Sequence, residues 1–488
     1  MKYLSLLAIL FFGCATSQPS PNPSPNIVVI YMDDLGYGDI GPFGAQGYAT
    51  PHLDQFAKEG TKFTSFYSAQ AVCSASRCAL MTGCYPNRVG LAGALGPHSK
   101  IGLATEETTL AEICKQKNYA TGIFGKWHLG DEKRFLPLNQ GFDEYFGLPY
   151  SNDMTPRGKP HGVAHERDHY PKLPLISQNS LADADVDAAD QDQLTTLYTE
   201  HAVDFIRRHK EQPFFLYLPH SMVHVPLHVS DKFRGKSGHG LFADVMIEVD
   251  WSVGQVMQAL KDNGLDDKTL VVFSSDNGPW LSFGDHAGSA GPLREGKGTS
   301  WEGGVREPTL MRWPGHIPAG SSCDAPLMTI DLLPTVAKLI GAPLPERKID
   351  GLDISSVITG KSSESPHEAL YFYYHKNDLE ALRSGKWKLG FARSYRSLQG
   401  RPGGRDGKAV DYGASRVSRP ELYDLDADPG EKIDLAASQP EVVARLQKLA
   451  EKARAELGDD LTRRKGSENR PAGKIDRLAE YPDSFPRL

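Results

Sequence analysis

Side chains that could hold a hard cation follow two apolar runs of the 488-residue chain. Asp33 and Asp34 come directly after the run 27–32, and Asp276 and Asn277 come directly after TLVVFSS. Carboxylate and amide oxygens are the ligands that Ca²⁺ and Mg²⁺ prefer, whereas structural zinc favours nitrogen and sulfur. These four residues therefore predict a site for a hard cation, Ca²⁺ or Mg²⁺.

Basic and imidazole side chains follow two other apolar runs. The segment YATGIFG leads to Lys126 and His128, and PFFLYLP leads to His220 and His224. Each of these four clusters, taken alone, is also typical of a turn or a solvated loop. Four clusters at four strand ends favour one shared site, because ligands of α/β sheets bind beyond the carboxyl ends of the strands.

The apolar runs that precede these clusters are continuous and do not alternate with polar residues, although YATGIFG is the weaker strand candidate. Such runs are typical of strands that are buried on both faces, as in a parallel sheet covered by helices. The segment 242–264 has apolar residues at helical spacing and ends at Asn263-Gly264. Alternating strands and helices predict an α/β fold with a mostly parallel sheet.

The N-terminal residues indicate an export signal. Lys2 precedes the apolar run 4–12, which is too short to cross a bilayer, and Gly13-Cys14 closes that run ahead of a Ser/Pro/Asn linker. This resembles a bacterial lipoprotein signal, in which Cys14 becomes the lipidated first residue. We expect an exported protein, periplasmic or anchored to the outer membrane, and ordinary signal cleavage remains the alternative.

The cysteine count adds a constraint. Beyond Cys14 the number of cysteines is odd, which leaves one thiol without a partner in an oxidising compartment. No C-x-x-C pair is present, which argues against a zinc site made of thiolates. The acidic run from Asp183 lacks the glycine and glutamate of an EF-hand loop and is predicted to be solvated. The five cysteines are Cys73, Cys78, Cys84, Cys114 and Cys323.

The segment CSASRCALMTG, residues 73–83, resembles the signature of the formylglycine-dependent sulfatases. Ala75 stands where proline is commoner in that signature. The blocks NIVVIYMDDLGYGD, GKWHLG, PYSND, HVP, SSDNGP and GKGTSWEGGVREP also stand in the family's order, so the resemblance spans about residues 26–435 and favours the arylsulfatase A branch. The matching signature positions are Cys73, Ala75, Ser76, Arg77, Leu80, Thr82 and Gly83.

The resemblance implies an alkaline phosphatase-like fold: a large mixed, mostly parallel sheet sandwiched by helices, with a smaller C-terminal α+β subdomain. It also implies that a formylglycine-generating enzyme oxidises Cys73 to Cα-formylglycine, which is then hydrated to a geminal diol. One hydroxyl attacks sulfur, and the second loses its proton and expels sulfate as the aldehyde reforms. The other four cysteines then allow two disulfides or none.

The resemblance also assigns roles to the strand-end residues. Asp33, Asp34, Asp276 and Asn277 would hold Ca²⁺ together with an oxygen of the modified Cys73.

The remaining roles concern the diol and the sulfate. Arg77 would fix the diol and offset the metal-site carboxylates. Lys126 and Lys297 would hold sulfate oxygens, and Ser151, in PYSND, would contact the diol or the sulfate. His128 would take the proton from the second hydroxyl. His224 would contact the sulfate and, with Lys297, help protonate the leaving alcohol, and the sequence does not rank the two as general acid.

The chain divides into four expected parts. Residues 1–25 are the leader and linker, and 26–366 form the catalytic domain. Residues 367–457 form a subdomain with an antiparallel sheet, because EALYFYY and LEALRSGKWKLGF alternate and turn at Ser384-Gly385, and a helix follows from Pro440. Residues 458–488 form a polar tail.

A net charge of −7 does not support nucleic-acid binding, so an anionic ligand would need a local cluster of cations. The loop 393–419 carries seven Lys or Arg residues and two Asp. Two readings stay open: a solvated loop, or a loop that reaches over the active site and binds a second anionic group of a sulfated glycan.

The sequence thus predicts an exported sulfuric ester hydrolase acting on a sulfated carbohydrate. One alternative is a phosphate or phosphonate monoester hydrolase of the same superfamily, which would more usually carry a Ser or Thr nucleophile and two zinc ions. The other is a lipoprotein that binds sulfated glycans without catalysis because Cys73 is never converted.

Overall fold

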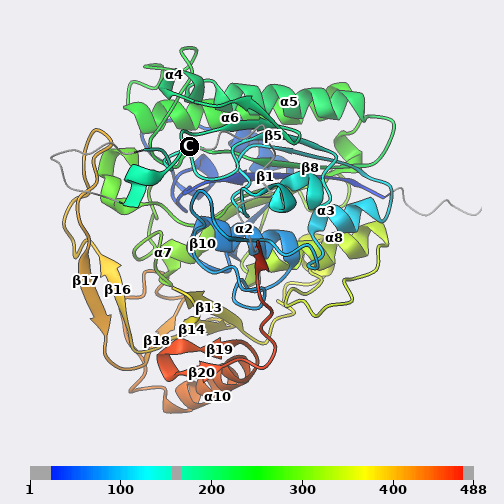
Figure 1. Cartoon of the computed structure of the whole chain (residues 1–488). Helices are drawn as coiled ribbons and strands as arrows, with labels where there is room; N and C mark the ends of the chain where they lie inside the picture. The colour runs from blue at the N-terminus through cyan, green and yellow to red at the C-terminus, as the bar shows by residue number, and fades with distance from the viewer. Residues whose placement is uncertain (1–23, 157–165, 476–488) are drawn as a thin grey trace, which may run out of the picture.

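The computed structural model describes residues 24–156 and 166–475. The leader with Cys14 and the end of the polar tail, 476–488, lie outside the described residues. An eleven-stranded mixed sheet runs through the larger part of the molecule in the order β11-β2-β10-β9-β1-β8-β4-β5-β6-β7, with β12 beside β2 (Figure 1). The strands are β1 (Asn26–Met32), β2 (Thr61–Tyr67), β4 (Ala120–Phe124), β5 (Glu144–Gly147), β6 (Leu175–Ser177), β7 (Ser180–Asp183), β8 (Phe214–Pro219), β9 (Thr269–Ser275), β10 (Arg306–Arg312), β11 (Ser321–Cys323) and β12 (Leu327–Met328).

The four apolar runs identified in the sequence form four adjacent strands at the centre of this sheet. The strands β9, β1, β8 and β4 are neighbours in that order, and each pairs in parallel with the next. Their carboxyl ends therefore lie along the same edge of the sheet. The mostly parallel sheet expected from the sequence is confirmed, with antiparallel pairing at β10 and from β5 through β7.

Helices cover both faces of the sheet, because alternate residues of each strand point to opposite sides. On β1, Ile27 and Tyr31 belong to a core shared with α2, α3 and α8, whereas Val28 and Ile30 belong to a core shared with α1, α5 and α6. All seven residues of β1 are buried. The main helices are α1 (Pro51–Glu59), α2 (Cys73–Thr82), α3 (Leu110–Lys115), α5 (Leu194–Arg208), α6 (Leu241–Asp262) and α8 (Leu332–Ile340), with the short α4 (Ala188–Gln191), α7 (Glu302–Val305) and α9 (Ser355–Ile358).

A smaller antiparallel sheet lies beside the main body, in the order β13-β14-β15-β18 (Figure 1). Its strands are β13 (Leu370–Tyr374), β14 (Asp378–Ser384), β15 (Trp387–Gly390) and β18 (Glu421–Asp424), and α10 (Pro440–Leu457) packs on it. The hairpin turns at Gly385, whose φ of 58° suits glycine. This sheet confirms the expected C-terminal subdomain fold. A separate hairpin, β16 (Arg393–Ser397) and β17 (Gly413–Val417), carries the basic loop.

The first part of the expected polar tail lies against the body of the molecule. Strand β21 (Gly473–Lys474) pairs with β3 (Ile101–Gly102), and the Arg470 guanidinium donates to both carboxylate oxygens of the buried Glu107. These contacts hold residues 458–475 in place. Among the described residues, no helix is both long and apolar enough to cross a membrane.

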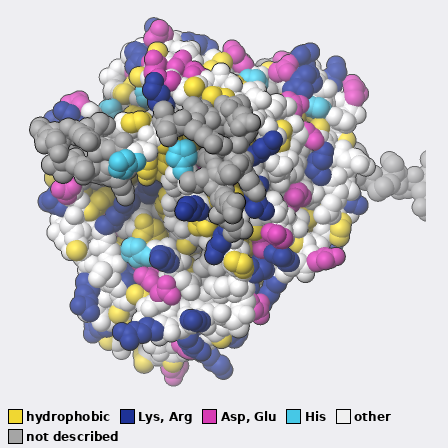
Figure 2. Space-filling view, viewed as in Figure 1, with side chains coloured by type: hydrophobic (Ala, Val, Ile, Leu, Met, Phe, Trp, Pro, Cys, Tyr) yellow, Lys and Arg dark blue, Asp and Glu magenta, His cyan; other side chains and the backbone are white. Residues whose placement is uncertain are grey.

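Acidic and basic side chains are interspersed over the face of the molecule seen in Figure 2. A local group of three buried cations, Arg77, Lys126 and Lys297, lies at the carboxyl ends of the central strands.

Candidate active site

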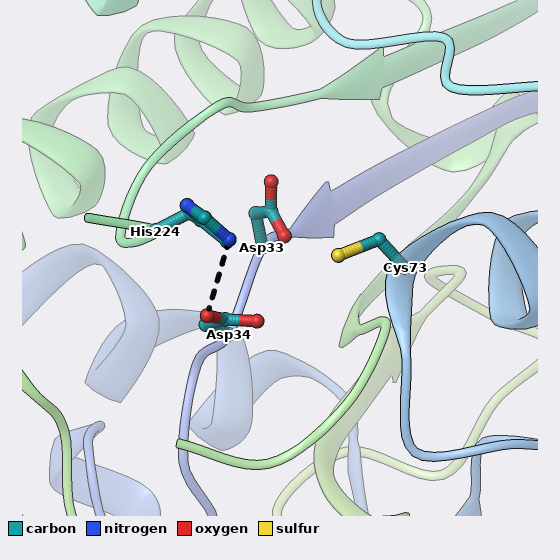
Figure 3. Close-up of side chains that lie close together, drawn as sticks. All are labelled: Asp33, Asp34, Cys73 and His224. Atoms are coloured by element: carbon teal, nitrogen blue, oxygen red, sulfur yellow. Dashed lines mark ion pairs between the residues drawn. The ribbon is translucent and has the colours of Figure 1, made fainter. Parts of the chain in front are cut away.

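Four buried side chains meet beyond the carboxyl end of β1 (Figure 3). Asp33 and Asp34 follow directly after β1, Cys73 is the first residue of α2, and His224 lies in the segment after β8. The potential ligand atoms of these four residues all lie within 4.8 Å of one another, and His224 Nε2 is 3.6 Å from Asp34 Oδ2. The expected convergence of separate strand ends at one place is thus present in the fold.

Two buried lysines neutralise the aspartate pair. The Lys126 ammonium contacts Asp33 Oδ2 and donates to Ser151 Oγ at 3.2 Å. Lys297 Nζ lies 2.7 Å from Asp34 Oδ1. Burial alone would raise the pKa of Asp33, but the nearby cations, led by Lys126, hold that pKa well below its usual value. Asp33 is therefore ionised at neutral pH.

Arg77 ties together the strand ends. It lies on α2 one turn beyond Cys73, and its side chain is fully buried. Its Nε and Nη2 donate to Asp276 Oδ2 at 3.0 and 2.8 Å, and its Nη1 donates to the backbone oxygen of Lys126 at 3.0 Å. One guanidinium thus fixes α2, the end of β9 and the segment after β4 relative to one another.

We expect Arg77→Met to destabilise the protein strongly, because it leaves Asp276 and Asp33 buried without that cation. Removing one partner of a buried ion pair costs about 3–5 kcal/mol. Denaturant unfolding with a chelator present measures this loss without compensation by a bound cation. Arg207→Met is the matched control, since the Arg207–Asp204 pair is largely exposed and worth about 0–1 kcal/mol. Equal losses in both variants would contradict this role of Arg77.

The site contains buried oxygens that no protein group satisfies. Asp33 Oδ1 and Asn277 Oδ1 are both buried without a hydrogen-bond partner, although Asn277 Nδ2 donates to Asp34 Oδ1 at 2.7 Å. Burial and the neighbouring Asp33 raise the pKa of Asp276 to about 7. Buried oxygens without hydrogen-bond partners are costly, and burial also disfavours the ionised form of the nearby carboxylates. A hard divalent cation bound to these oxygens would offset both costs, so the residues fit Ca²⁺ or Mg²⁺.

Cys73 lies beside this oxygen cluster and close to Lys297. Its side chain is buried, its Sγ is 3.5 Å from Lys297 Nζ, and burial raises the pKa of the thiol to about 12. A neutral thiol is a poor nucleophile, because the thiolate is the reactive form. Cys73 is the first residue of α2, so the positive end of the helix dipole lies at this cluster.

None of the cysteines in the described residues is in a disulfide. Cys73, Cys78, Cys84 and Cys114 are buried, Cys323 is half-buried, and all five are free thiols. Of the two disulfide states that the sequence left open, the structure has the one without bridges.

Two histidines present a nitrogen lone pair to the site. His128 Nε2 lies 2.8 Å from the Leu95 carbonyl oxygen, so Nε2 carries the proton and the buried, unpartnered Nδ1 is the acceptor. Burial lowers the pKa of His128 well below its usual value, with Lys126 acting in the same direction. His224 Nδ1 donates to the Val225 carbonyl at 2.6 Å, which turns Nε2 toward Asp34.

The chain matches known proteins over most of its length. The family model described as "Sulfatase" matches residues 25–342, and the model described as "C-terminal region of aryl-sulfatase" matches residues 365–473. The chain belongs to the sulfatase family. This sulfatase is 39% identical to human arylsulfatase A over 473 residues, which cover 91% of the chain and 90% of that protein. It is 35% identical to N-acetylgalactosamine-6-sulfatase of Canis lupus familiaris, covering 91% of the chain and 88% of that protein.

Two solved structures share most of this fold. The PsFucS1 sulfatase from Pseudoalteromonas sp. superimposes with a TM-score of 0.80 at 27% identity, covering 88% of this chain and 90% of that chain. Ps i-CgsB in complex with k-i-k-neocarrahexaose gives a TM-score of 0.74 at 29% identity, covering 94% and 96%. With curated sulfatases among its relatives, the chain is a sulfatase enzyme, a hydrolase of sulfate esters.

The structure also shows what the sequence did not reveal about this sulfatase. The Trp280 ring lies 5.5 Å from the His224 ring and 4.6 Å from Lys297 Nζ, and its place directly after DNGP was the available signal. His220, in contrast, points away into the fold, with Nε2 3.1 Å from Ser252 Oγ. Trp280 therefore lines the site, which the sequence did not predict. His220 takes part in the packing of the fold and not in the site.

Proposed function

We propose that this sulfatase removes sulfate from a sulfated carbohydrate, with Cys73 converted to formylglycine and Ca²⁺ bound by Asp33, Asp34, Asp276 and Asn277. One observation carries the proposal. Cys73 lies within 4.8 Å of the ligand atoms of Asp33 and Asp34, while its thiol is held neutral and unreactive. The position is therefore suited to a different, oxygen-based group, for which the Sγ atom stands in.

The charges of the site suit a sulfate ester. Three buried carboxylates face the three cations Arg77, Lys126 and Lys297, so a divalent cation leaves the site positive. When bound, Ca²⁺ would supply Lewis-acid stabilisation to the sulfate oxygens. The hydrated formylglycine would supply an oxygen nucleophile together with a second hydroxyl on the same carbon.

The surrounding side chains then have defined tasks. Lys126 and Lys297 hold sulfate oxygens, with Ser151 hydrogen-bonded to Lys126. His128 accepts a proton at Nδ1, the nitrogen that the structure leaves without a partner. Lys297 can protonate the leaving alcohol, and His224, beside Asp34, can do so once its Nε2 has taken up a proton.

A carbohydrate substrate is supported by the relatives. One is named for sulfate removal from N-acetylgalactosamine, and a structural neighbour was solved with neocarrahexaose bound. A formylglycine-generating enzyme is the partner that the conversion of Cys73 requires. Export with a lipid anchor at Cys14 remains a proposal from the sequence, on residues outside the described range.

Rate measurements on matched aryl sulfate and aryl phosphate esters test the reaction class. We expect kcat/KM to favour the sulfate by at least about a hundredfold. A phosphate ester that loses even one of the contacts made in the transition state of the sulfate ester would react more slowly by this factor. A preference for the phosphate would replace the proposal with the phosphomonoesterase alternative. An unmodified Cys73 thiol in protein from the native source, together with no turnover of either ester, would favour the non-catalytic alternative.

A further inference from the structure

The basic loop between β16 and β17 is held against the rim of the active site. Gly404 N and Val410 N donate to the Ser282 carbonyl at 2.9 and 3.0 Å, and Ser282 N donates to Tyr412 Oη at 3.1 Å. Ser282 belongs to the short helix η7 (Leu281–His286), directly after Trp280. In Figure 1 the orange loop of this hairpin rises along the edge of the molecule from the small sheet. The loop is therefore packed against the protein, which favours the interpretation that it reaches over the active site and not that it is a solvated loop.

Arg396 on β16 lies at the backbone of an active-site lysine. Its Nε donates to the Lys297 carbonyl at 3.0 Å, and its Nη2 contacts the same oxygen. The Nζ of Lys297 is in turn 3.5 Å from Cys73 Sγ. Lys297 thus connects the two positions: its backbone carbonyl contacts the Arg396 guanidinium, and its ammonium lies beside Cys73.

The charge of Arg396 has no counterion among the described residues. Elsewhere on this segment, Arg393 pairs with Glu380 and Arg419 with Asp434, but no carboxylate of the described chain lies at ion-pair distance from Arg396. Its guanidinium instead packs 4.7 Å from the Tyr412 ring centroid and 5.9 Å from that of Trp280, and the side chain is half-buried. Aromatic packing holds the cation in place and leaves its charge available.

Aromatic side chains connect this cation to the reacting position. Trp280 packs against both His224 and Lys297. Tyr374, the last residue of β13, lies near Arg396 and Lys297: burial raises its pKa, whereas these two cations act to lower it. A saccharide whose sulfate ester is held at Cys73 would therefore extend past Trp280 toward Arg396.

We propose that Arg396, backed by Trp280 and Tyr412, binds a second anionic group of the substrate, a sulfate or a carboxylate carried by the same saccharide. The inference rests on the proposed function and deepens it, since it assigns the substrate to the polyanionic saccharides. Lys126 and Lys297 are occupied by the scissile sulfate, so a second anion requires a further cation. A guanidinium matches sulfate and carboxylate geometry with paired hydrogen bonds.

Steady-state kinetics on three saccharides of one backbone test the proposal. The first carries only the scissile sulfate, the second a further sulfate, and the third a carboxylate. We expect kcat/KM of the unchanged protein to favour at least one dianionic saccharide over the first by about 10–100-fold, the worth of a hydrogen bond to a charged group. Which of the two is favoured identifies the anion. In Arg396→Gln we expect this ratio to fall toward one, chiefly through KM.

Two further variants separate binding from positioning. Arg396→Lys keeps the charge but loses the paired hydrogen bonds to the Lys297 carbonyl, so it should retain part of the preference. Arg416→Gln, at an exposed position on β17, should leave the rates and the preference unchanged. If Arg396 only positions Lys297, both Arg396 variants will slow all three saccharides alike with an unchanged ratio, which overturns the proposal.

The outcomes also distinguish this inference from the proposed function. Hydrolysis of the monosulfated saccharide without any preference for the dianionic ones overturns the inference alone. Failure of the unchanged protein to hydrolyse any of the three overturns the proposed function and the inference with it.

Discussion

Replacing Cys73 with serine will reduce steady-state turnover of an aryl sulfate by at least about a thousandfold, because losing a nucleophile removes most of a hydrolase's rate enhancement. A serine has one hydroxyl, so it can attack sulfur but has no second hydroxyl on the same carbon to expel the sulfate. We therefore expect a stable serine sulfate at position 73. Intact-mass spectrometry after incubation with substrate would show a single addition of SO₃.

The matched control is Cys78→Ser. Cys78 lies on the same helix and is equally buried, but it faces the hydrophobic core and no active-site group. It should lose some stability and keep its activity per folded molecule. Before the assay, mass analysis must show that the serine at position 73 is unmodified. Multiple turnovers by a confirmed Cys73→Ser protein would contradict the mechanism.

Removing the metal will abolish sulfatase activity and lower the melting temperature, and adding Ca²⁺ will restore both. Asp33, Asp34 and Asp276 are buried together, and Asp33 Oδ1 and Asn277 Oδ1 have no protein partner. A ligand that binds only the folded state at a hundred times its Kd adds about 2.7 kcal/mol of stability. We expect Mg²⁺ to restore less than Ca²⁺, because Mg²⁺ needs near-ideal octahedral geometry.

A pair of variants localises this effect. Asp33→Asn should eliminate the rise in melting temperature on adding Ca²⁺, because it removes a charged ligand. Asp185→Asn changes an exposed residue of the solvated acidic run and should leave that rise intact. A Ca²⁺ response that survives in Asp33→Asn but disappears in Asp185→Asn would place the metal in the acidic run and contradict the assignment.

The central strands could be predicted from the sequence because their signal is local. The run before Asp33 is apolar at every position, and it forms the fully buried β1. Its neighbours β9 and β8 are also predicted by continuous apolar runs. Because ligands of parallel sheets bind beyond the carboxyl ends of the strands, the edge where the polar clusters meet could be predicted as well. The helix from Pro440 and the turn at Gly385 likewise depend on nearby residues.

The rest of the site depends on contacts between distant segments. Nothing local in REPTLMR indicates that β10 inserts antiparallel between β9 and β2. The contact of Arg396 with the Lys297 carbonyl joins residues 99 positions apart and exists only because the hairpin packs on η7. Asp34 has a φ of 61°, a left-handed conformation that the neighbouring residues in the sequence do not predict. Such features require the tertiary fold.

The mass of the peptide that contains residue 73, taken from protein of the native source, tests the central claim most directly. The account predicts that cysteine at this position has been replaced by formylglycine, which lacks sulfur and is lighter than cysteine in its aldehyde form. Peptides containing Cys78 and Cys114 should keep the mass of an unmodified cysteine. An unmodified thiol at position 73 in catalytically active protein would contradict the account.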